Sequence, residues 1–369
     1  MTPQYKEQIP APMAWRGGDF TKDQIAFDLT TNQVAALEDI LGRVEKANLS
    51  MREIRPEHAR HPALDAPLAK VFNEIQHGRG ITIVRGFPVA RFSVDQIGKM
   101  FWAVGAHFGH GVSQSALGDV LGHVRDETPP GQAESARGYL SRRELQLHTD
   151  LGQIVGLMCV RQSRTGGFSQ YASGLAIHNE LLATRPDLMP LYYRGFRYHR
   201  RGEQPADHPQ ITPYNVPVFS NVDGNVSVFY VREISAVAMR DLGIDYTAEE
   251  NDALDTFRTT ARKLQFETRL EPGEASFLNN LTTLHARSEF DDWDETDKKR
   301  LMLRLWLDAH HDQRPSVREI HIYENKGGVS GIDPVPGRLP AVAEYHVPAR
   351  VAAERSASWI RRISAKRSR

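Results

Sequence analysis

Apolar residues recur at three- and four-residue spacing in two stretches of the chain, a pattern typical of amphipathic helices. The first stretch covers residues 32–44. The second covers residues 247–264, where Thr247 precedes two acidic residues and apolar side chains stand at positions 254, 257, 261 and 264. A threonine cap with acidic residues in the first turn marks the start of a helix. We therefore expect helices over both stretches, and shorter ones over 68–76 and 93–104.

Most of the remaining chain has the pattern of short strands. Apolar or alternating runs bounded by Gly, Pro and Ser favour extended structure. Residues 219–230 form two such runs around Asp223-Gly224, which is a strong signal for a hairpin. The other expected strands are residues 80–87, 154–160, 264–270, 275–278 and 300–308. Many short strands with one helix inserted late predict a mainly β fold with helical additions, built on a jelly-roll core.

Three regions of the chain differ in pattern. Residues 1–60 are expected to form an N-terminal helical extension packed on the core. Residues 61–345 are expected to form a double-stranded β-helix (jelly-roll) domain with a helical insert near 247–264. Residues 346–369 are basic and poor in apolar side chains towards their end, which predicts a solvated C-terminal tail.

Composition narrows the class of protein. Lys plus Arg and Asp plus Glu number 46 each, so the chain lacks the basic excess expected of a nucleic-acid-binding protein. The single cysteine, Cys159, excludes an intrachain disulfide and a cysteine-based metal site. We see neither a signal peptide nor an apolar run of membrane-spanning length, and therefore expect a cytoplasmic protein without a membrane partner.

Candidate chemistry centres on two histidines and one carboxylate. In a strand, side chains two residues apart project from the same face, so His148 and Asp150 can reach one metal ion. His285 lies 137 residues later and offers a second imidazole. Two imidazoles and one carboxylate form the facial triad of non-haem Fe(II) oxygenases, which leaves coordination positions open. A His-x-Asp motif alone is weak evidence, because the chain has 15 histidines.

Four stretches, in order, resemble the TauD/TfdA family of Fe(II)/2-oxoglutarate-dependent dioxygenases. The first is similar to an early family strand that ends in Arg-Gly. The second is similar to the run into the first two metal ligands, and the third to a Gly-Gly turn placed after them. The fourth is similar to the distal histidine and the arginines that follow it. The stretches are residues 80–87, 137–150, 163–169 and 279–304.

The resemblance implies a set of ligands for a metal and a cosubstrate. His148, Asp150 and His285 match the residues that bind Fe(II). Arg300, 15 residues after His285, matches the arginine that holds the distal carboxylate of 2-oxoglutarate. A planar guanidinium suits this role because it pairs with a carboxylate through two parallel hydrogen bonds. Ser169 falls where the family commonly has a hydroxyl on the same carboxylate.

Other residues are candidates for the surroundings of the site. Arg304 matches a position that binds the anionic group of the substrate in the taurine enzyme and that can support the cosubstrate in relatives. A further alternative is a pair with a structural carboxylate. Arg137 and Tyr139 precede the first metal stretch closely enough to line the substrate pocket. Asn279 and Asn280 are expected to hydrogen-bond the backbone around the distal histidine, as groups that orient metal ligands do.

An acidic loop separates His285 from Arg300, over a distance that is often shorter in the family. Its carboxylates are Asp291, Asp292, Asp294, Glu295 and Asp297. A solvated loop is the simplest interpretation. The loop could instead cover the mouth of the pocket and disfavour anionic substrates, which would conflict with an anion site at Arg304.

These observations predict a dioxygenase that uses Fe(II), 2-oxoglutarate and O2 to hydroxylate, or otherwise oxidise at C–H, a small organic substrate, with release of succinate and CO2. Two alternatives belong to other classes. A zinc-type hydrolase would use the same His-Asp-His set and give no role to Arg300. A non-catalytic jelly-roll binding protein would be expected to lose a ligand or the arginine. A homodimer or homotetramer would fit the family.

Overall fold

The computed structural model describes residues 3–115, 118–126, 141–204, 207–323 and 332. The fold described below belongs to one unit of the chain, residues 1–335. The domain boundaries expected near residues 60 and 345 stay predictions. Among the described residues, no helix is long and apolar enough to cross a membrane.

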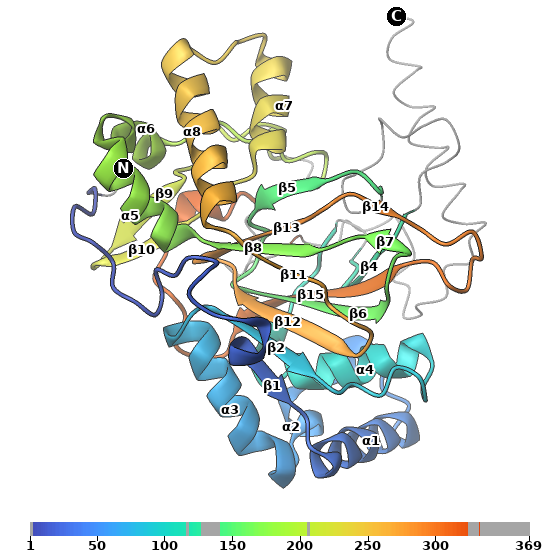
Figure 1. Ribbon diagram of the computed structural model, residues 1–369. Coiled ribbons are helices and arrows are strands. Elements are labelled where there is room, and N and C mark those ends of the chain that lie inside the picture. The colour runs from blue at the N-terminus through green and yellow to red at the C-terminus, as the bar shows by residue number, and fades with distance from the viewer. Residues whose placement is uncertain (1–2, 116–117, 127–140, 205–206, 324–331, 333–369) are drawn as a thin grey trace, which may run out of the picture. The chain divides into compact units, whose positions relative to one another are not determined.

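A seven-stranded sheet forms one layer of the fold (Figure 1). Its strand order is β1-β2-β12-β6-β15-β3, and β4 also pairs with β15. Only β1 and β2 run parallel; the other pairs are antiparallel. The strands are β1 (Ala26–Asp28), β2 (Ile81–Arg85), β3 (Gly109–Gly111), β4 (Leu121–Val124), β6 (Ile154–Arg161), β12 (Glu274–Asn279) and β15 (Leu301–Ala309). The strand β1 comes from the expected N-terminal extension, so this part of the chain adds a strand as well as helices.

A smaller antiparallel sheet with the order β11-β8-β13-β5 lies over the larger one (Figure 1). Its strands are β5 (Leu145–His148), β8 (Ser169–Ser173), β11 (Phe266–Thr268) and β13 (Thr283–Arg287). Two short ribbons join β7 (Thr165–Gly166) to β14 (Phe290–Asp291) and β9 (Phe219–Val222) to β10 (Asn225–Val228). Together the sheets confirm the mainly β, jelly-roll architecture.

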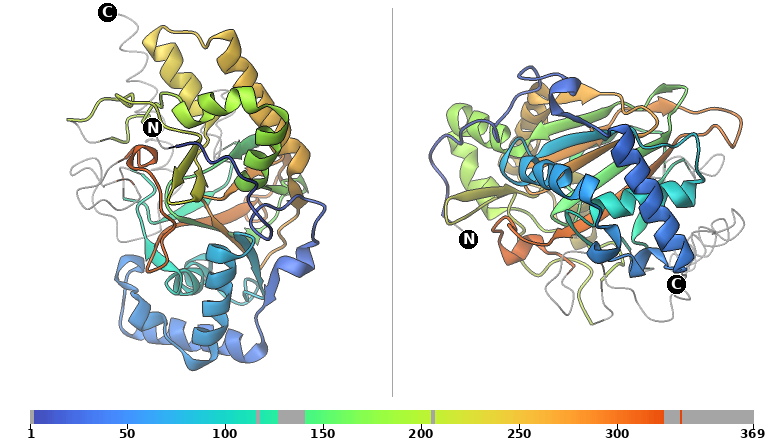
Figure 2. Two further views of the ribbon diagram at one scale, coloured as in Figure 1. Left: turned by 90° about the vertical axis from the view of Figure 1, so that its left-hand side faces the viewer. Right: turned by 90° about the horizontal axis from the view of Figure 1, so that it is seen from below.

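Helices cover the outer faces of both sheets. Figures 1 and 2 show α1–α4 on the side of the larger sheet and α5–α8 on the opposite side. The first group is α1 (Thr31–Lys46), α2 (Pro56–Ala59), α3 (Pro62–His77) and α4 (Val94–Gly105). The second group is α5 (Gly174–Thr184), α6 (Met189–Arg194), α7 (Arg232–Leu242) and α8 (Ala248–Leu264). The short 3-10 helices among the described residues are η1 (Lys22–Ile25), η2 (Met51–Glu53), η4 (Pro186–Leu188) and η5 (Arg318–Ile320).

Local signals explain why several elements begin or turn where they do. The hydroxyls of Ser93 and Thr247 accept hydrogen bonds from the backbone amides of Gln96 and Glu250, which caps α4 and α8 as predicted. The turn between β9 and β10 places Asp223 and Gly224 at φ values of 52° and 82°. Both central residues of a type I′ hairpin turn need positive φ, so the Asp-Gly pair was a reliable signal.

Three helices were missed by the periodicity argument, which expected only one insert near 247–264. The segment between β8 and β11 also contains α5, α6 and α7. In α5 nearly the whole first half is buried, from Gly174 to His178, so there is no polar face to produce a 3.6-residue pattern. The expected helix at 68–76 is the second half of α3, which begins at Pro62 behind the cap residue His61.

Candidate active site

His148 and His285 meet across two neighbouring strands of the smaller sheet. They are register partners on β5 and β13, and their ring centroids lie 4.4 Å apart. Both residues are buried. The Nδ1 atom of His148 lies 2.8 Å from the carbonyl oxygen of Gln146. Because a carbonyl oxygen only accepts, Nδ1 is the protonated nitrogen, and Nε2 carries the lone pair that a metal requires.

Asp150 completes the cluster from the loop that follows β5. Its Oδ1 lies 3.8 Å from Nε2 of His148, and its Oδ2 lies 3.5 Å from Nε2 of His285. One candidate ligand atom from each of the three residues falls within 4.8 Å of the others. Tertiary structure therefore brings together the three residues that the sequence selected, in a set of two nitrogens and one carboxylate that suits a divalent transition metal.

His148 and Asp150 have the protonation states that metal ligands require. Burial, and after it the neighbouring His285, lowers the pKa of His148 to about 4, so its imidazole is neutral at pH 7. Burial opposes ionisation of Asp150, but Arg304 and the two histidines outweigh it and hold the pKa of its carboxyl below the usual range. A neutral imidazole and an ionised carboxylate are the forms in which these two residues can ligate a metal.

Asn280 fixes the loop that carries Asp150. Its Oδ1 accepts a hydrogen bond from the Asp150 amide at 2.8 Å, and its Nδ2 donates to the carbonyls of Asp150 and Gly152, each at 2.8 Å. Asn279 instead bonds Gln76 and the Leu281 amide. The expectation that both asparagines order the backbone around His285 thus needs a correction: Asn280 orders the Asp150 loop, because the turn after β12 lies against it.

We predict that Asn280→Ala lowers the affinity for divalent metal by about 10- to 100-fold, the usual effect of removing a group that orients a metal ligand. The physical reason is that three hydrogen bonds hold the loop, and alanine replaces none of them. The measurement is a Co(II) titration without O2. Asn279→Ala is the matched control, because this neighbour is equally buried and does not touch the loop. Equal weakening by the two variants would contradict the assignment.

Arg304, Trp306 and Gln114 surround the Asp150 carboxylate from the side of the larger sheet. Nη1 of Arg304 lies 3.3 and 3.2 Å from the two carboxylate oxygens, and Nε1 of Trp306 donates to Oδ2 at 2.9 Å. Arg304 Nε in turn donates to Oε1 of Gln114 at 2.8 Å. Arg304, expected to bind substrate, is thus engaged with a carboxylate of the protein. Sequence reasoning missed Trp306 and Gln114, since nothing near either residue in the chain points to a metal ligand.

Arg300 is a buried cation whose side-chain donors are largely unused. It is only 3% exposed, and its Nε and Nη1 have no hydrogen-bond partner among the described residues. The Phe290 ring lies 5.1 Å from the guanidinium carbon. Burial lowers the pKa of Arg300 to about 10, which still leaves it charged at pH 7. A buried, charged donor without an acceptor is costly, and such orphan groups mark the place of an absent ligand.

The Gly-Gly turn packs directly against this guanidinium. Gly167 adopts φ of +66°, and a Cβ added there would lie 2.6 Å from Ser163 Oγ and 3.3 Å from Arg300 Nε. Ser169, on the strand that leaves the turn, is buried and is the register partner of Arg287. Arg287 is also buried, and its guanidinium carbon lies 4.8 Å from the Phe290 ring. Two buried arginines therefore share one aromatic ring beside Ser169, and the sequence indicated only Arg300.

The acidic loop folds towards Arg300 at one position. Asp292 is 4% exposed, and its Oδ1 accepts hydrogen bonds from the backbone amides of Arg300, at 2.8 Å, and Trp293. The other four acidic residues of the loop are exposed, as the solvated interpretation expects. Trp293 Nε1 donates to the carbonyl of Gln162, next to the Gly-Gly turn. The loop is thus hydrogen-bonded to the backbone of Arg300 and of Gln162.

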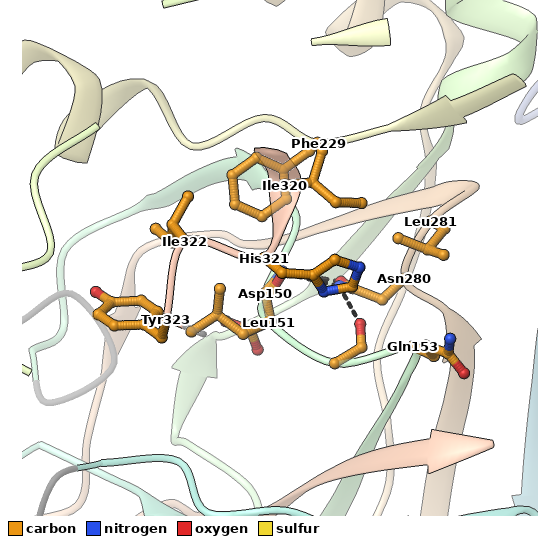
Figure 3. A pocket seen from close by; sticks show the side chains of 11 residues that line it. Asp150, Leu151, Gln153, Phe229, Asn280, Leu281, Ile320, His321, Ile322 and Tyr323 are labelled. Carbon is orange, nitrogen blue, oxygen red and sulfur yellow. Dashed lines mark hydrogen bonds between the residues drawn. The ribbon is translucent and has the colours of Figure 1, made fainter. Parts of the chain in front are cut away.

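Two cavities adjoin the chain segment that carries His148 and Asp150. The smaller has a volume of about 20 Å³, room for about one water molecule. Figure 3 shows its lining, in which Asp150 and Asn280 face Phe229 and the segment from Ile320 to Tyr323. The larger, of about 200 Å³, lies beside β5 and is lined by Gln146, Leu147, Tyr230, Arg232, Glu233, Ala236, Arg258, Ala261 and Arg262. Arg137 and Tyr139, expected to line the substrate pocket, lie outside the described residues.

The chain is similar to known proteins in sequence and in fold. The chain is 30% identical over 253 residues to FR-33289 synthase of Streptomyces rubellomurinus, covering 67% of this chain and 74% of that protein. It is 28% identical over 306 residues to the taurine hydroxylase-like protein SAT17 of Stachybotrys chartarum, covering 79% and 78%. The structure of an asparagine oxygenase in complex with Fe(II), 3-hydroxyasparagine and succinate superposes with a TM-score of 0.62 at 18% identity, covering 77% of this chain and 93% of that one.

At 18% identity the structural likeness establishes the fold, while the family follows from the sequence. Residues 51–306 match the family described as taurine catabolism dioxygenase TauD, TfdA family. This match spans more than half of the chain and includes the His148, Asp150 and His285 cluster as well as Arg300. The chain therefore belongs to the TauD, TfdA family of 2-oxoglutarate-dependent, non-haem iron dioxygenases.

Proposed function

We propose that His148, Asp150 and His285 hold Fe(II), and that Arg300 and Ser169 hold the distal carboxylate of 2-oxoglutarate. The donor set supports the metal, because two imidazole nitrogens and one carboxylate suit Fe(II) and leave positions for a chelating cosubstrate and O2. The observation that carries the cosubstrate is the orphaned guanidinium of Arg300. A carboxylate is the acceptor that a planar guanidinium pairs with best.

The bound iron and cosubstrate would activate O2 for attack on a substrate C–H bond, with release of succinate and CO2. The chain's own residues hold the ligating groups in position. Gln146 fixes the tautomer of His148, and Asn280 fixes the loop of Asp150. Arg300 and Arg287 are buried, where an electrostatic interaction is stronger than in bulk water.

We further propose that the reaction is hydroxylation of a small organic molecule. The name of the taurine hydroxylase-like relative and the 3-hydroxyasparagine held by the structural relative support this reaction class. A zinc-type hydrolase is less well supported, because it would leave the unused donors of Arg300 without a purpose. A substrate-lining role for Arg137 and Tyr139, a cytoplasmic location and a homo-oligomeric state stay predictions from the sequence.

Anaerobic addition of Fe(II), followed by 2-oxoglutarate, tests the proposal. We expect a weak visible metal-to-ligand charge-transfer band that appears only when both are present, because chelation of the iron by the cosubstrate produces it. A circular dichroism spectrum confirms that the protein is folded in the same sample. Absence of the band in folded wild-type protein would refute the proposed assignment, and His285→Gln is the control that should abolish it.

A further inference from the structure

The carboxylate that the proposed metal needs is already paired with a protein cation. Arg304 Nη1 reaches both oxygens of Asp150, at 3.3 and 3.2 Å, and the two side chains are 12% and 10% exposed. This is a buried ion pair within the candidate metal cluster. The attraction between Arg304 and Asp150 that stabilises the protein in the absence of metal is partly lost when a divalent cation binds the same carboxylate.

Arg304 is held in this position by its neighbours. Its Nε donates to Oε1 of Gln114, and Nε2 of Gln114 donates back to the Arg304 carbonyl, both at 2.8 Å. The guanidinium carbon lies 4.6 Å from the ring centroid of Trp306, in the geometry of a cation–π contact. Space is restricted as well, since a Cβ added at Gly122 would lie 2.8 Å from Gln114 Oε1. These contacts hold the Arg304 guanidinium in place beside Asp150.

The net charge around Asp150 differs between the metal-free and the metal-bound protein. Without metal, the charges of the Asp150 carboxylate and the Arg304 guanidinium, whose nearest atoms lie 3.2 Å apart, cancel. Leaving one buried charge of such a pair without its partner is strongly unfavourable. With metal, a double positive charge binds within a few ångströms of Arg304, and like charges at that distance repel each other in a poorly solvated site. Arg304 therefore stabilises the metal-free state more than the metal-bound state.

We propose that Arg304 is the counter-ion of Asp150 in the metal-free protein and lowers the affinity of the centre for divalent metal. It stabilises the metal-free protein, and it makes the site bind metal less tightly than its three ligands would without this cation. This inference rests on the proposed function, because it takes His148, Asp150 and His285 as the metal ligands. It gives Arg304 a positioning role in place of the expected contact with the substrate.

Arg304→Met tests the proposal without turnover. Co(II) is the probe, and its dissociation constant is measured without O2 and without 2-oxoglutarate. We expect Co(II) to bind on the order of tenfold more tightly than to the wild type, a typical size for coupling between sites. In EDTA the Tm should fall by at least about 5 °C, because Asp150 is left buried and unpaired. The rise in Tm on adding Co(II) should be larger than in the wild type.

Two further variants separate charge from shape. Arg304→Gln keeps a hydrogen-bond donor without the charge, should also tighten Co(II) binding, and serves if the methionine variant does not fold. Trp306→Phe is the matched control, because it removes a neutral donor to the same Asp150 oxygen; it should not tighten Co(II) binding. Unchanged or weaker Co(II) binding by both Arg304 variants would overturn the proposal.

The same titration distinguishes failure of this inference from failure of the proposed function. If the wild type binds Co(II) and His285→Gln does not, the metal site is in place and the Arg304 variants decide the inference alone. If the wild type and His285→Gln bind Co(II) equally, the metal assignment fails and this inference fails with it.

Discussion

Asp150→Asn is expected to weaken divalent metal binding by at least about 100-fold, more than the loss of an outer group costs, and to reduce turnover to background. The substitution keeps the size of the side chain and removes the only carboxylate of the cluster in which the three candidate ligands meet. It also leaves the guanidinium of Arg304 buried without its ion-pair partner. Breaking a buried pair in this way costs about 3–5 kcal/mol, so the free energy of unfolding of the metal-free protein should fall as well.

Urea denaturation in EDTA and a Co(II) titration measure the two effects separately. His285→Gln is the matched control: it also removes a ligand, but the pair of Asp150 and Arg304 remains. It should lose metal binding with a smaller loss of unfolding free energy than Asp150→Asn. Co(II) affinity of Asp150→Asn within about threefold of the wild type, a difference under 1 kcal/mol, would rule out Asp150 as a ligand.

Arg300→Met is expected to weaken the binding of 2-oxoglutarate without lowering the stability of the ligand-free protein. The apparent Kd for 2-oxoglutarate should rise by at least about 30-fold, because truncating one partner of a buried, hydrogen-bonded charge pair costs about 2 kcal/mol or more. The Tm without ligand should stay the same or rise, since the donors Nε and Nη1 are already unsatisfied in the folded state. Binding to the Co(II)-loaded protein, followed by calorimetry, gives the Kd.

Arg314→Met is the control for loss of a partly buried arginine. Burial lowers the pKa of Arg314 to about 10, as it does for Arg300, but the donors of Arg314 are used by the Val226 carbonyl. This variant should lose stability and keep its affinity for 2-oxoglutarate. If Arg300→Met instead destabilises the ligand-free protein as much as Arg314→Met does, Arg300 is a structural residue.

Much of the architecture could be predicted because its determinants are close together in the chain. The Thr247 cap, the Asp-Gly turn at 223–224 and the apolar strand at 154–160 each depend on contacts within a few residues. The spacing of two residues also suggested a shared metal for His148 and Asp150, but on the premise of a common strand, whereas β5 ends at His148 and Asp150 lies in the loop after it. The pairing of His148 with His285 required the family resemblance, because no local pattern connects residues 137 positions apart.

The surroundings of the site could not be predicted in this way. The sequence left open whether Arg304 meets a substrate anion or a protein carboxylate, and assigned Asn280 to the wrong ligand. It also treated the acidic loop as one unit, although Asp292 is buried against Arg300 while its acidic neighbours are exposed. The helix α5 was missed because burial on nearly all sides removes the periodic signal.

Local sequence thus specified the elements of this protein and the residue types of its metal cluster, since backbone preferences and side-chain periodicity act over a few residues. Tertiary structure alone decided which charges and hydrogen-bonding groups meet. Asp150 and Arg304 are 154 residues apart; Asp150 follows β5 of the smaller sheet and Arg304 lies in β15 of the larger one, so their contact depends on how the sheets pack. The partner of a buried charge is set by what packing places within a few ångströms, because water is not there to replace it.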